Sequence, residues 1–332
     1  MKQQVYNDSM YTPQIDNHEV GAPSSRSRAL EILLFGEVLA DVYPDRRMPG
    51  GAPFSVGCHL AACGIPVALV SRLGVDSLGD FLQMALARSG IDPGFVQRDP
   101  EHASGHVDVI ATVDGHRFEI VPDQAFDFID GTTLHNDLSR GQVQPRLIYF
   151  GTLAQRNSAS RAALDSLLAV CEATRFVDLN LRPPWISADV VEKSLTAANI
   201  VKLSEEELCY VGSLLGLPAA MEGEAIARQL AQRFAIDMIV VTCGARGAWC
   251  LCGELVQRVA AVPANTIEGD AVGAGDAFSA ICILGHLLHW DMPSTLNRAA
   301  AFAAAICGIR GPVPESLQFY GRFRERWRLE HN

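Results

Sequence analysis

Short apolar runs that alternate with helical patterns constrain the fold of this 332-residue chain more than any other feature. The run at 31–35 (EILLF) is apolar and ends at a glycine, which is typical of a strand buried inside a parallel sheet. A helix pattern follows over 53–63, then a strand pattern over 67–71 and a helix pattern over 76–88. Parallel strands need helical crossovers, so this alternation predicts an α/β fold with helices covering a sheet.

The same alternation continues through the second half of the chain. Further strand patterns lie at 147–150, 175–178, 199–202 and 237–241, and further helix patterns lie at 158–173, 223–234, 274–289 and 293–307. No internal repeat or long structureless linker separates them, so we predict one main domain over 29–320. Residues 1–28 are polar and are expected to form a disordered leader, and 321–332 are expected to form a C-terminal tail.

Two segments break this rhythm. Residues 38–43 alternate apolar and polar side chains, as do 106–113 and 116–121, which are joined by Asp114-Gly115, a strong hairpin signal. We therefore expect a small antiparallel β lid, inserted at about 38–50 and 93–122. Because exposed sheet edges need covering, we expect two lids to pair in a homodimer.

Composition excludes several classes of partner. With 27 Lys+Arg against 38 Asp+Glu, the formal charge of −11 argues against a nucleic-acid partner. No run near 18 apolar residues and no signal-peptide pattern occurs, so we expect no membrane partner and a cytoplasmic location. The nine cysteines and nine histidines show no spacing of a metal or redox centre, and we expect a reducing compartment.

The strongest candidate for chemistry is the segment 269–278 (GDAVGAGDAF), which leads into an apolar helix. Gly273, Ala274 and Gly275 would let backbone N–H groups at the helix start converge on an anion. Asp276 in the first turn would repel that anion, unless it serves as a base facing a hydroxyl nucleophile. On these residues alone the alternative stays equally open that the turn is merely tight and that Asp276 caps the helix.

Together with Gly50-Gly51-Ala52-Pro53, this segment resembles the two signature regions of the PfkB or ribokinase-like carbohydrate kinases. The resemblance runs from about 32 to 314, and the motifs are most similar to those of bacterial fructokinase-type members. It includes the segments 150–153 (FGTL), 178–183 (DLNLRP), 202–207 (KLSEEE) and 241–247 (VTCGARG). It implies a ribokinase-like three-layer α/β/α sandwich with a small β lid. It also implies ATP-dependent phosphorylation of a sugar with Mg²⁺, which works mainly by positioning and charge stabilisation.

By this resemblance, Asp276 is the catalytic base, and Gly273, Ala274 and Gly275 supply anion-hole N–H groups. Sugar contacts are implied for a set of six residues, namely Asp41, Gly50, Gly51, Ser55, Asn180 and Arg182. Contacts with ATP are implied for Lys202, Thr242, Gly244 and Gly247. Glu207 would influence Mg²⁺ through water, and Asp270 lies where family members hold a monovalent cation such as K⁺.

Several of these positions carry a structural alternative. Asp41 would be a solvated lid residue, and Arg182 would be part of an ordinary ion pair. Ser204 followed by Glu207 also forms a capping box, which needs no metal. Thr242 with its neighbouring glycines would be a plain turn between strands.

The chain departs from the family pattern at three places. Ser55 and Ser204 stand where the family commonly has Asn, and Ala271 stands where it usually has Thr, which leaves one hydroxyl fewer for K⁺. We predict a kinase acting on fructose or a related ketose or hexose. The alternative is a catalytically weak relative that serves as a sugar- or nucleotide-responsive binding or scaffold protein.

Overall fold

The computed structural model describes residues 30–112, 115–141, 143–264 and 269–329, so the expected leader over 1–28 lies outside the described residues. A nine-stranded sheet runs through the molecule in the order β13-β12-β11-β10-β9-β8-β1-β4-β5. Its strands are β1 (Ile32–Phe35), β4 (Val67–Gly74), β5 (Val96–Asp99), β8 (Leu147–Phe150), β9 (Thr174–Asp178), β10 (Ile200–Ser204), β11 (Met238–Thr242), β12 (Ala248–Cys252) and β13 (Leu255–Val259).

The strands from β11 to β5 in this order are parallel, and only β12 and β13 run antiparallel to their neighbours. Successive side chains of a strand point to opposite faces, so the sheet separates two hydrophobic cores. In β1, Ile32 and Leu34 belong to one core, whereas Leu33 and Phe35 belong to the other. Both faces are therefore covered, which explains the uninterrupted apolar runs in the sequence.

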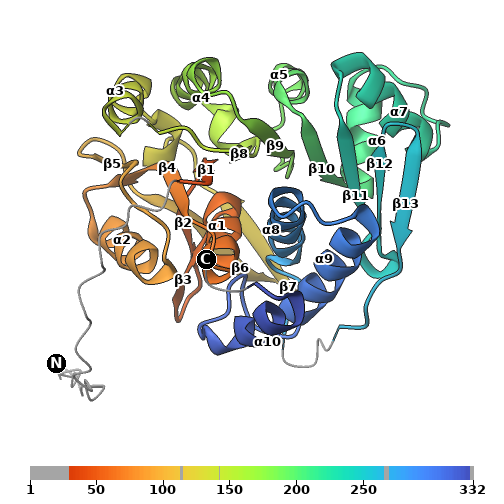
Figure 1. The fold of residues 1–332 in the computed structure, drawn as a ribbon. Coiled ribbons are helices and arrows are strands. Elements are labelled where there is room, and N and C mark those ends of the chain that lie inside the picture. Colours follow the sequence, from red (N-terminus) through yellow and green to blue (C-terminus); the bar gives the residue numbers. More distant parts are fainter. Residues whose placement is uncertain (1–29, 113–114, 142, 265–268, 330–332) are drawn as a thin grey trace.

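Helices cover both faces of the sheet, as Figure 1 shows for α3, α4 and α5 on one side and for α1, α8 and α9 on the other. The helices are α1 (Ala52–Ala62), α2 (Ser77–Ser89), α3 (Gly131–Gly141), α4 (Ser158–Val170), α5 (Ala188–Ala197), α6 (Glu205–Leu214), α7 (Gly223–Phe234), α8 (Ala274–Leu287), α9 (Met292–Ile306) and α10 (Gln318–Trp327). The expected three-layer α/β/α architecture is confirmed.

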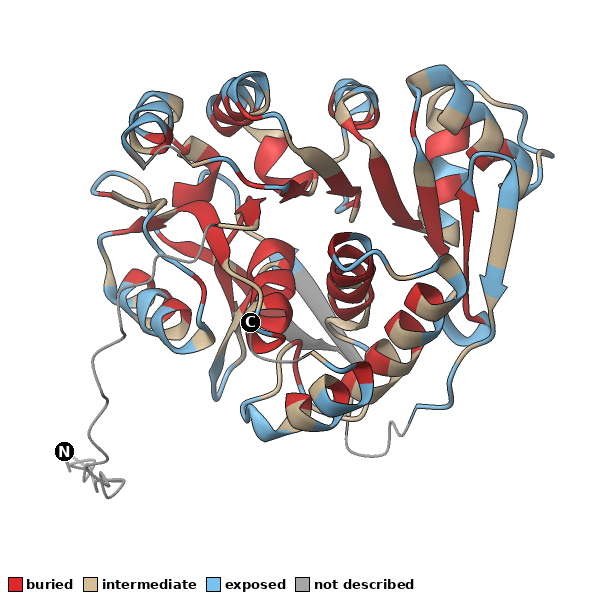
Figure 2. Ribbon diagram, in the orientation of Figure 1, coloured by how far each residue is buried: buried red, intermediate tan, exposed pale blue. Residues whose placement is uncertain are grey.

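Helices α1 and α8 are buried almost all round (Figure 2). They lie against the sheet on one side, and α9, α10 and α2 contribute to the same core on the other side. This double burial explains why both sequences are apolar without a clear polar face. The first turn of α8, from Ala274 to Asp276, is half-buried and leads into this core.

The lid is a four-stranded sheet in the order β3-β2-β6-β7, formed by β2 (Leu39–Val42), β3 (Arg47–Gly50), β6 (Gly105–Thr112) and β7 (Gly115–Ile120). The predicted hairpin between β6 and β7 is present, although Asp114 of its turn lies outside the described residues. Two expectations need correction. The lid is mixed rather than antiparallel, because β2 pairs with β6 in parallel, and β5 at 96–99 extends the main sheet by pairing with β4.

The C-terminal segment also differs from the expected tail. Helix α10 extends from Gln318 to Trp327, and its Tyr320, Phe323 and Trp327 side chains are buried against Phe302 of α9. The Tyr320 hydroxyl lies 2.9 Å from His59 Nδ1 in α1. These aromatic contacts make α10 part of the core and correct the expectation of a C-terminal tail from residue 321.

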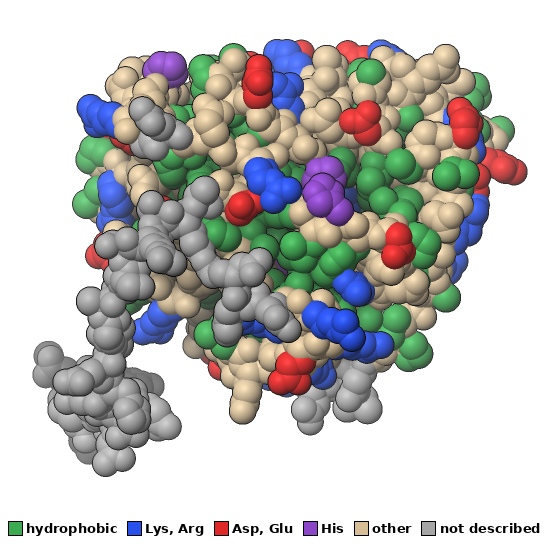
Figure 3. Space-filling model, in the orientation of Figure 1, with side chains coloured by type: hydrophobic (Ala, Val, Ile, Leu, Met, Phe, Trp, Pro, Cys, Tyr) green, Lys and Arg blue, Asp and Glu red, His purple; other side chains and the backbone are tan. Residues whose placement is uncertain are grey.

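The surface carries charges of both signs. On the face drawn in Figure 3, Lys and Arg side chains are interspersed with Asp and Glu side chains over the described residues, and they do not gather into a broad basic field. Among the helices of the described part of the chain, not one combines the length and the apolarity that a membrane crossing requires.

Candidate active site

The candidate residues gather where the parallel strands end. The last residues of β1, β8, β9, β10 and β11 lie at one edge of the sheet, because parallel strands share their direction. The chain order reverses between β1 and β8, which makes this point a topological switch, the usual place for ligands in open α/β sheets. Strands β2 and β3 of the lid follow β1 directly at this edge.

The first turn of α8 contains the backbone N–H groups that the sequence predicts for an anion site. Gly273 caps the helix with a φ of 78°, and an added Cβ there would lie 2.5 Å from the Cα atom of Pro312, so only glycine fits. The N–H group of Ala274 donates to the Ala271 oxygen at 3.3 Å, unlike the free N–H group expected from the sequence. The N–H groups of Gly275 and Asp276 also lie in the first turn, so no carbonyl oxygen of a preceding helical turn is there to accept their hydrogen bonds.

Asp276 is a half-buried carboxyl group among other charges. Burial, together with the carboxylates of Asp178 and Glu37, raises its pKa to about 7, and the cations of Lys202 and Arg182 act in the opposite sense. A pKa near neutrality suits a group that must take a proton from a hydroxyl and release it again. The surroundings of Asp276 therefore suit the predicted role of a base, which stays a prediction.

The Arg182 guanidinium is the cation that the site carboxyls share. It lowers the pKa of Asp41, Glu37 and Asp276, so these side chains from the lid, from the end of β1 and from α8 converge on one region. Burial nevertheless raises the pKa of Asp41 to about 6 and that of Glu37 to about 7. Arg182 itself is exposed, so its planar donor group remains accessible to a ligand.

Two glycines bring the backbone close to these carboxyls. At Gly50 an added Cβ would lie 3.2 Å from Asp41 Oδ2. At Gly51, whose φ is 102°, it would lie 2.5 Å from the backbone carbonyl oxygen of Glu37. Glu37 Oε1 in turn accepts the N–H of Ala52 at 3.2 Å. The glycine pair therefore lies directly against Asp41 and Glu37, where a side chain at either position would fill the space.

Ser55 and Asn180 are placed less directly. Ser55 lies one turn into α1 and is 1% exposed, and its hydroxyl has no hydrogen-bond partner among the described residues. Asn180 follows β9 with a φ of 41°, a left-handed conformation that asparagine tolerates. Both belong to segments that border the site, but no contact with Asp276 is recorded for either.

Lys202 is found in a different environment from the expected one. Its Nζ donates to both oxygens of Asp178, at 3.1 and 3.0 Å, inside the core. The ammonium lies under Gly275, where an added Cβ would be 3.1 Å from Nζ. Contact with ATP was expected for this lysine, whereas the structure turns its charge toward a buried carboxylate.

The expected nucleotide loop follows β11 and contains Thr242, Gly244 and Gly247. Gly244 has a φ of 54° with open space around it, whereas a Cβ on Gly247, with a φ of 99°, would lie 2.1 Å from the Val259 oxygen. The Cys243 N–H donates to the Gly247 oxygen at 2.8 Å and closes the loop. The loop is thus a tight turn that also presents backbone on its open side at Gly244.

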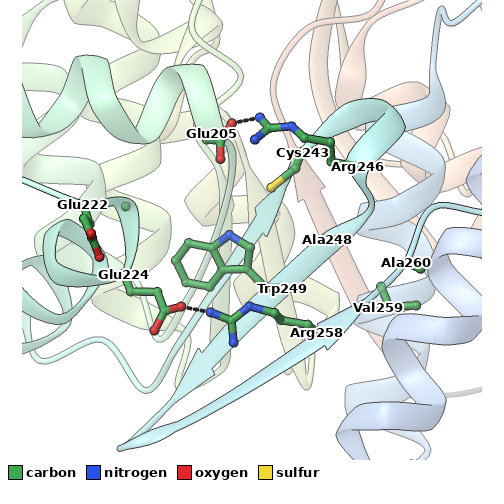
Figure 4. Close-up of a pocket in the computed structure, with 11 residues that line it drawn as sticks. Glu205, Glu222, Glu224, Cys243, Arg246, Ala248, Trp249, Arg258, Val259 and Ala260 are labelled. Atoms are coloured by element: carbon green, nitrogen blue, oxygen red, sulfur yellow. Dashed lines mark hydrogen bonds and ion pairs between the residues drawn. The ribbon is translucent and has the colours of Figure 1, made fainter.

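A cavity of about 500 Å³ opens beside this loop, lined by Trp249, by Arg246 and Arg258, and by Glu205, Glu222 and Glu224 (Figure 4). Arg246 pairs with Glu205, and Arg258 pairs with Glu224. With both arginines neutralised and a further glutamate present, the cavity does not suit a phosphate group. Trp249 belongs to the core on the α4–α7 side, whereas Ala248 and Val259, which also line the cavity, contribute to the core that includes α8, so the cavity borders both cores.

Glu207 forms the capping box that the sequence predicts. Its Oε2 accepts the N–H of Ser204 at 2.7 Å, and the Ser204 hydroxyl accepts the N–H of Glu207 at 3.1 Å. Its Oε1 accepts the N–H of Leu181 at 2.6 Å, which ties the segment after β9 to α6. Each carboxylate oxygen keeps a further lone pair, so a bridging water to Mg²⁺ remains compatible with these bonds.

Asp270 connects two loops by the same kind of contact. Its carboxylate accepts the N–H of Val272 at 3.0 Å and the N–H of Gly311 at 3.3 Å. Among the described residues no cluster of three His, Cys, Asp or Glu side chains forms a protein-only metal site. Mg²⁺ usually keeps several waters and few protein ligands, so the single carboxylate of Glu207 is compatible with a Mg²⁺ ion that arrives bound to the substrate.

Three site residues were not singled out from the sequence. Glu37, Asp178 and Ser279 all contribute to the environment of the candidate base or of its neighbours. Glu37 and Asp178 had a usable signal, because each is an acidic residue at the end of a buried strand pattern. Ser279 had none, since a small polar residue in an apolar helix is common.

Known proteins match this chain over most of its length. A family model described as "pfkB family carbohydrate kinase" matches residues 28–317. A fructokinase from Escherichia coli is 28% identical over 269 residues, which cover 77% of this chain and 84% of that protein. An aminoimidazole riboside kinase from Salmonella typhimurium is 25% identical over 317 residues, which cover 87% of this chain and 94% of that protein.

A solved structure is similar as well. It is a double mutant of fructokinase from Vibrio cholerae in a fructose, ADP and potassium ion bound form. Its TM-score is 0.71 at 25% identity, and the match covers 89% of this chain and 99% of that one.

Proposed function

The chain belongs to the pfkB family of carbohydrate kinases, and from this we propose that it transfers the γ-phosphoryl group of ATP to a primary hydroxyl of fructose or a related ketose or hexose. It is a phosphotransferase with an alcohol group as acceptor, and its fold is ribokinase-like. Fructokinases and a riboside kinase are both similar to it, so fructose is the finer part of the proposal.

The observation that carries the proposal is the placement of Asp276. This carboxyl has a pKa raised to about 7 and lies beside the open N–H groups of the α8 start. In the proposed reaction, Asp276 takes the proton of the sugar hydroxyl as its oxygen bonds to the γ-phosphorus. The bond from phosphorus to the leaving ADP oxygen breaks, and N–H groups at Gly275 and Asp276 stabilise the charge on the transferring group.

The remaining residues bind and orient the two substrates. Asp41 from the lid accepts sugar hydroxyls, Arg182 donates to the sugar, and Gly50 and Gly51 admit it close to the backbone. The loop from Thr242 to Gly247 borders the nucleotide. Glu207 would hold a Mg²⁺ ion through water, and this ion would supply charge neutralisation for the phosphates of ATP. Closure of the lid would exclude water and limit hydrolysis of ATP.

A potassium ion in the fructokinase neighbour supports a test of K⁺ at Asp270. The Asp270 carboxylate already accepts two backbone N–H groups, and Ala271 offers no hydroxyl. We therefore propose that K⁺ changes activity weakly here. A comparison of kcat in KCl and in tetramethylammonium chloride at equal ionic strength measures the effect, and a tenfold difference would contradict this part.

A coupled assay of ADP release tests the function. With Mg-ATP, the protein is offered fructose, ribose, glucose, aminoimidazole riboside, 2-keto-3-deoxygluconate and fructose 1-phosphate. Turnover with fructose that Asp276→Asn lowers by at least about 10³-fold, with sugar and nucleotide binding retained, supports the proposal. Ligand-induced thermal shifts without any turnover would instead favour a binding or scaffold protein.

A second variant separates the two substrates. Asp41→Asn keeps the shape of the side chain and removes its charge, so the KM for the sugar rises while the KM for ATP changes little. Equal rises in both KM values would place Asp41 outside the sugar site.

The homodimer expected through the lid is a separate proposal. Light scattering at micromolar concentration tests it, since a monomeric mass counts against it.

A further inference from the structure

A buried ion pair lies beneath the candidate base. Lys202 Nζ in β10 donates to both carboxylate oxygens of Asp178 at the end of β9, and the two side chains are 8% and 0% exposed. The Ser279 hydroxyl in α8 donates to Asp178 Oδ2 at 2.7 Å. We call Lys202, Asp178 and Ser279 the buried triad. It connects two neighbouring strands of the sheet to the helix that carries Asp276.

The buried triad also lies directly against the first turn of α8. Ser279 is three residues after Asp276, so both side chains lie on the same side of the helix. At Gly275 an added Cβ would lie 3.1 Å from Lys202 Nζ, so the ammonium faces the backbone that presents the anion-binding N–H groups. A side chain at Gly275 would therefore crowd Lys202 Nζ as well as narrow the access of an anion.

Stability alone does not explain such a pair. Removing two charges from water is costly, and well-packed apolar residues of similar size usually stabilise a core at least as well as a buried ion pair. This pair lies at the carboxyl edge of the sheet, next to the group that takes a proton in the proposed reaction. Its position therefore indicates a role in the site.

We propose that the buried triad is the positioning element of this kinase, in which Lys202 acts as an internal counter-charge beneath Asp276 and the α8 turn and does not bind ATP. The proposal rests on the proposed function, because it assigns the support of the same catalytic base. Asp178 fixes the ammonium, and Ser279 connects Asp178 to α8.

The charges that face Asp276 come from several elements. They are Asp178 from β9, Lys202 from β10, Arg182 from the segment after β9, and Glu37 from the end of β1. Asp178 raises the pKa of Asp276 and Lys202 lowers it, so the two members of the pair oppose each other. Removing Asp178 alone must then favour ionised Asp276, whereas removing both charges must restore a value near that of the unmodified protein.

The experiment compares pH profiles of kcat/KM in three variants. Asp178→Asn is expected to move the acid limb down by about one pH unit. The double variant Lys202→Met with Asp178→Asn is expected to return it toward the original pH and to fold without an unpaired charge. Asp99→Asn is the matched control, because Asp99 is also 0% exposed and paired with an arginine, Arg72, and the acid limb should not move.

The KM for ATP separates this role from nucleotide binding. The double variant is expected to lose kcat by at least tenfold while its KM for ATP changes less than about threefold, since Lys202 does not touch the nucleotide. A KM for ATP raised tenfold or more would overturn the proposal. An acid limb that stays in place in Asp178→Asn, or that moves equally in Asp99→Asn, would overturn it as well.

A measurement without substrate keeps the two proposals distinguishable. The carboxyl carbon-13 signal of Asp276, assigned by its loss in Asp276→Asn, reports the titration of this group directly. If no sugar is phosphorylated, the proposed function fails. The same downward shift of the Asp276 titration in Asp178→Asn, reversed in the double variant, would then still show that the pair controls Asp276, and its absence would refute the triad.

Discussion

Gly273 offers a sharp test of the reasoning about the anion-binding turn. Its φ of 78° lies in the left-handed region, and an added Cβ would lie 2.5 Å from both Cα and Cβ of Pro312. Backbone atoms cannot swing aside as a flexible side chain can. Gly273→Ala therefore meets two penalties, conformational strain and a clash with a neighbouring loop.

The chain contains a matched control for the first penalty. Gly253 in the turn between β12 and β13 has a φ of 56°, but nothing lies within 4 Å of an added Cβ. A left-handed alanine costs about 1–2 kcal/mol, and overpacking adds about 1–3 kcal/mol. The free energy of unfolding should thus fall by about 1–2 kcal/mol in Gly253→Ala and by about 2–5 kcal/mol in Gly273→Ala.

Denaturant unfolding followed by circular dichroism measures both losses, and the common effect of alanine on the unfolded chain cancels in the comparison. Because Asp276 lies three residues after Gly273, a shift of the turn should also lower kcat by about 10²-fold in Gly273→Ala only. Equal losses of stability in the two variants, or an unchanged kcat in Gly273→Ala, would refute the reasoning.

Three further predictions concern the same residues and the C-terminal helix. Because the pKa of Asp276 is raised to about 7 and the base must be ionised, kcat/KM should fall about tenfold per pH unit below neutrality, and a flat profile down to pH 5 would contradict this. The raised pKa also means that protonated Asp276 favours the fold, a contribution present below about pH 4 and lost as the pH rises through about 7. Asp276→Asn should therefore raise the melting temperature at pH 8 and not at pH 4, and calorimetry at both values decides it. Phe302→Ala removes the ring that Tyr320, Phe323 and Trp327 pack on, so unfolding experiments should show a loss of about 3–5 kcal/mol, and a loss below 1 kcal/mol would mean that α10 is not anchored there.

Local chemistry explains which parts of the fold were predictable. Each strand of the parallel part is buried on both faces and each crossover is helical, so periodicity alone indicated a covered sheet. Helix α10 carries aromatic residues at helical spacing among its charges, but its burial depends on Phe302 of α9, a contact that the sequence of α10 alone does not identify. The pairing of β5 with the main sheet and of β2 with β6 depends on contacts between distant segments, which no local pattern records.

The site divides in the same way. The glycine-rich start of α8, the aspartate within it, the capping box at Ser204 and Glu207, and the glycine turns could all be predicted, because each depends on residues a few positions apart. The packing of distant segments establishes the other relations: Lys202 pairs with Asp178, Arg182 acts on Asp41, Glu37 and Asp276, and Gly273 lies against Pro312. Those relations join strands, lid and helices that are far apart in the chain, and burial, which sets the charge of each carboxyl, exists only once they are packed together.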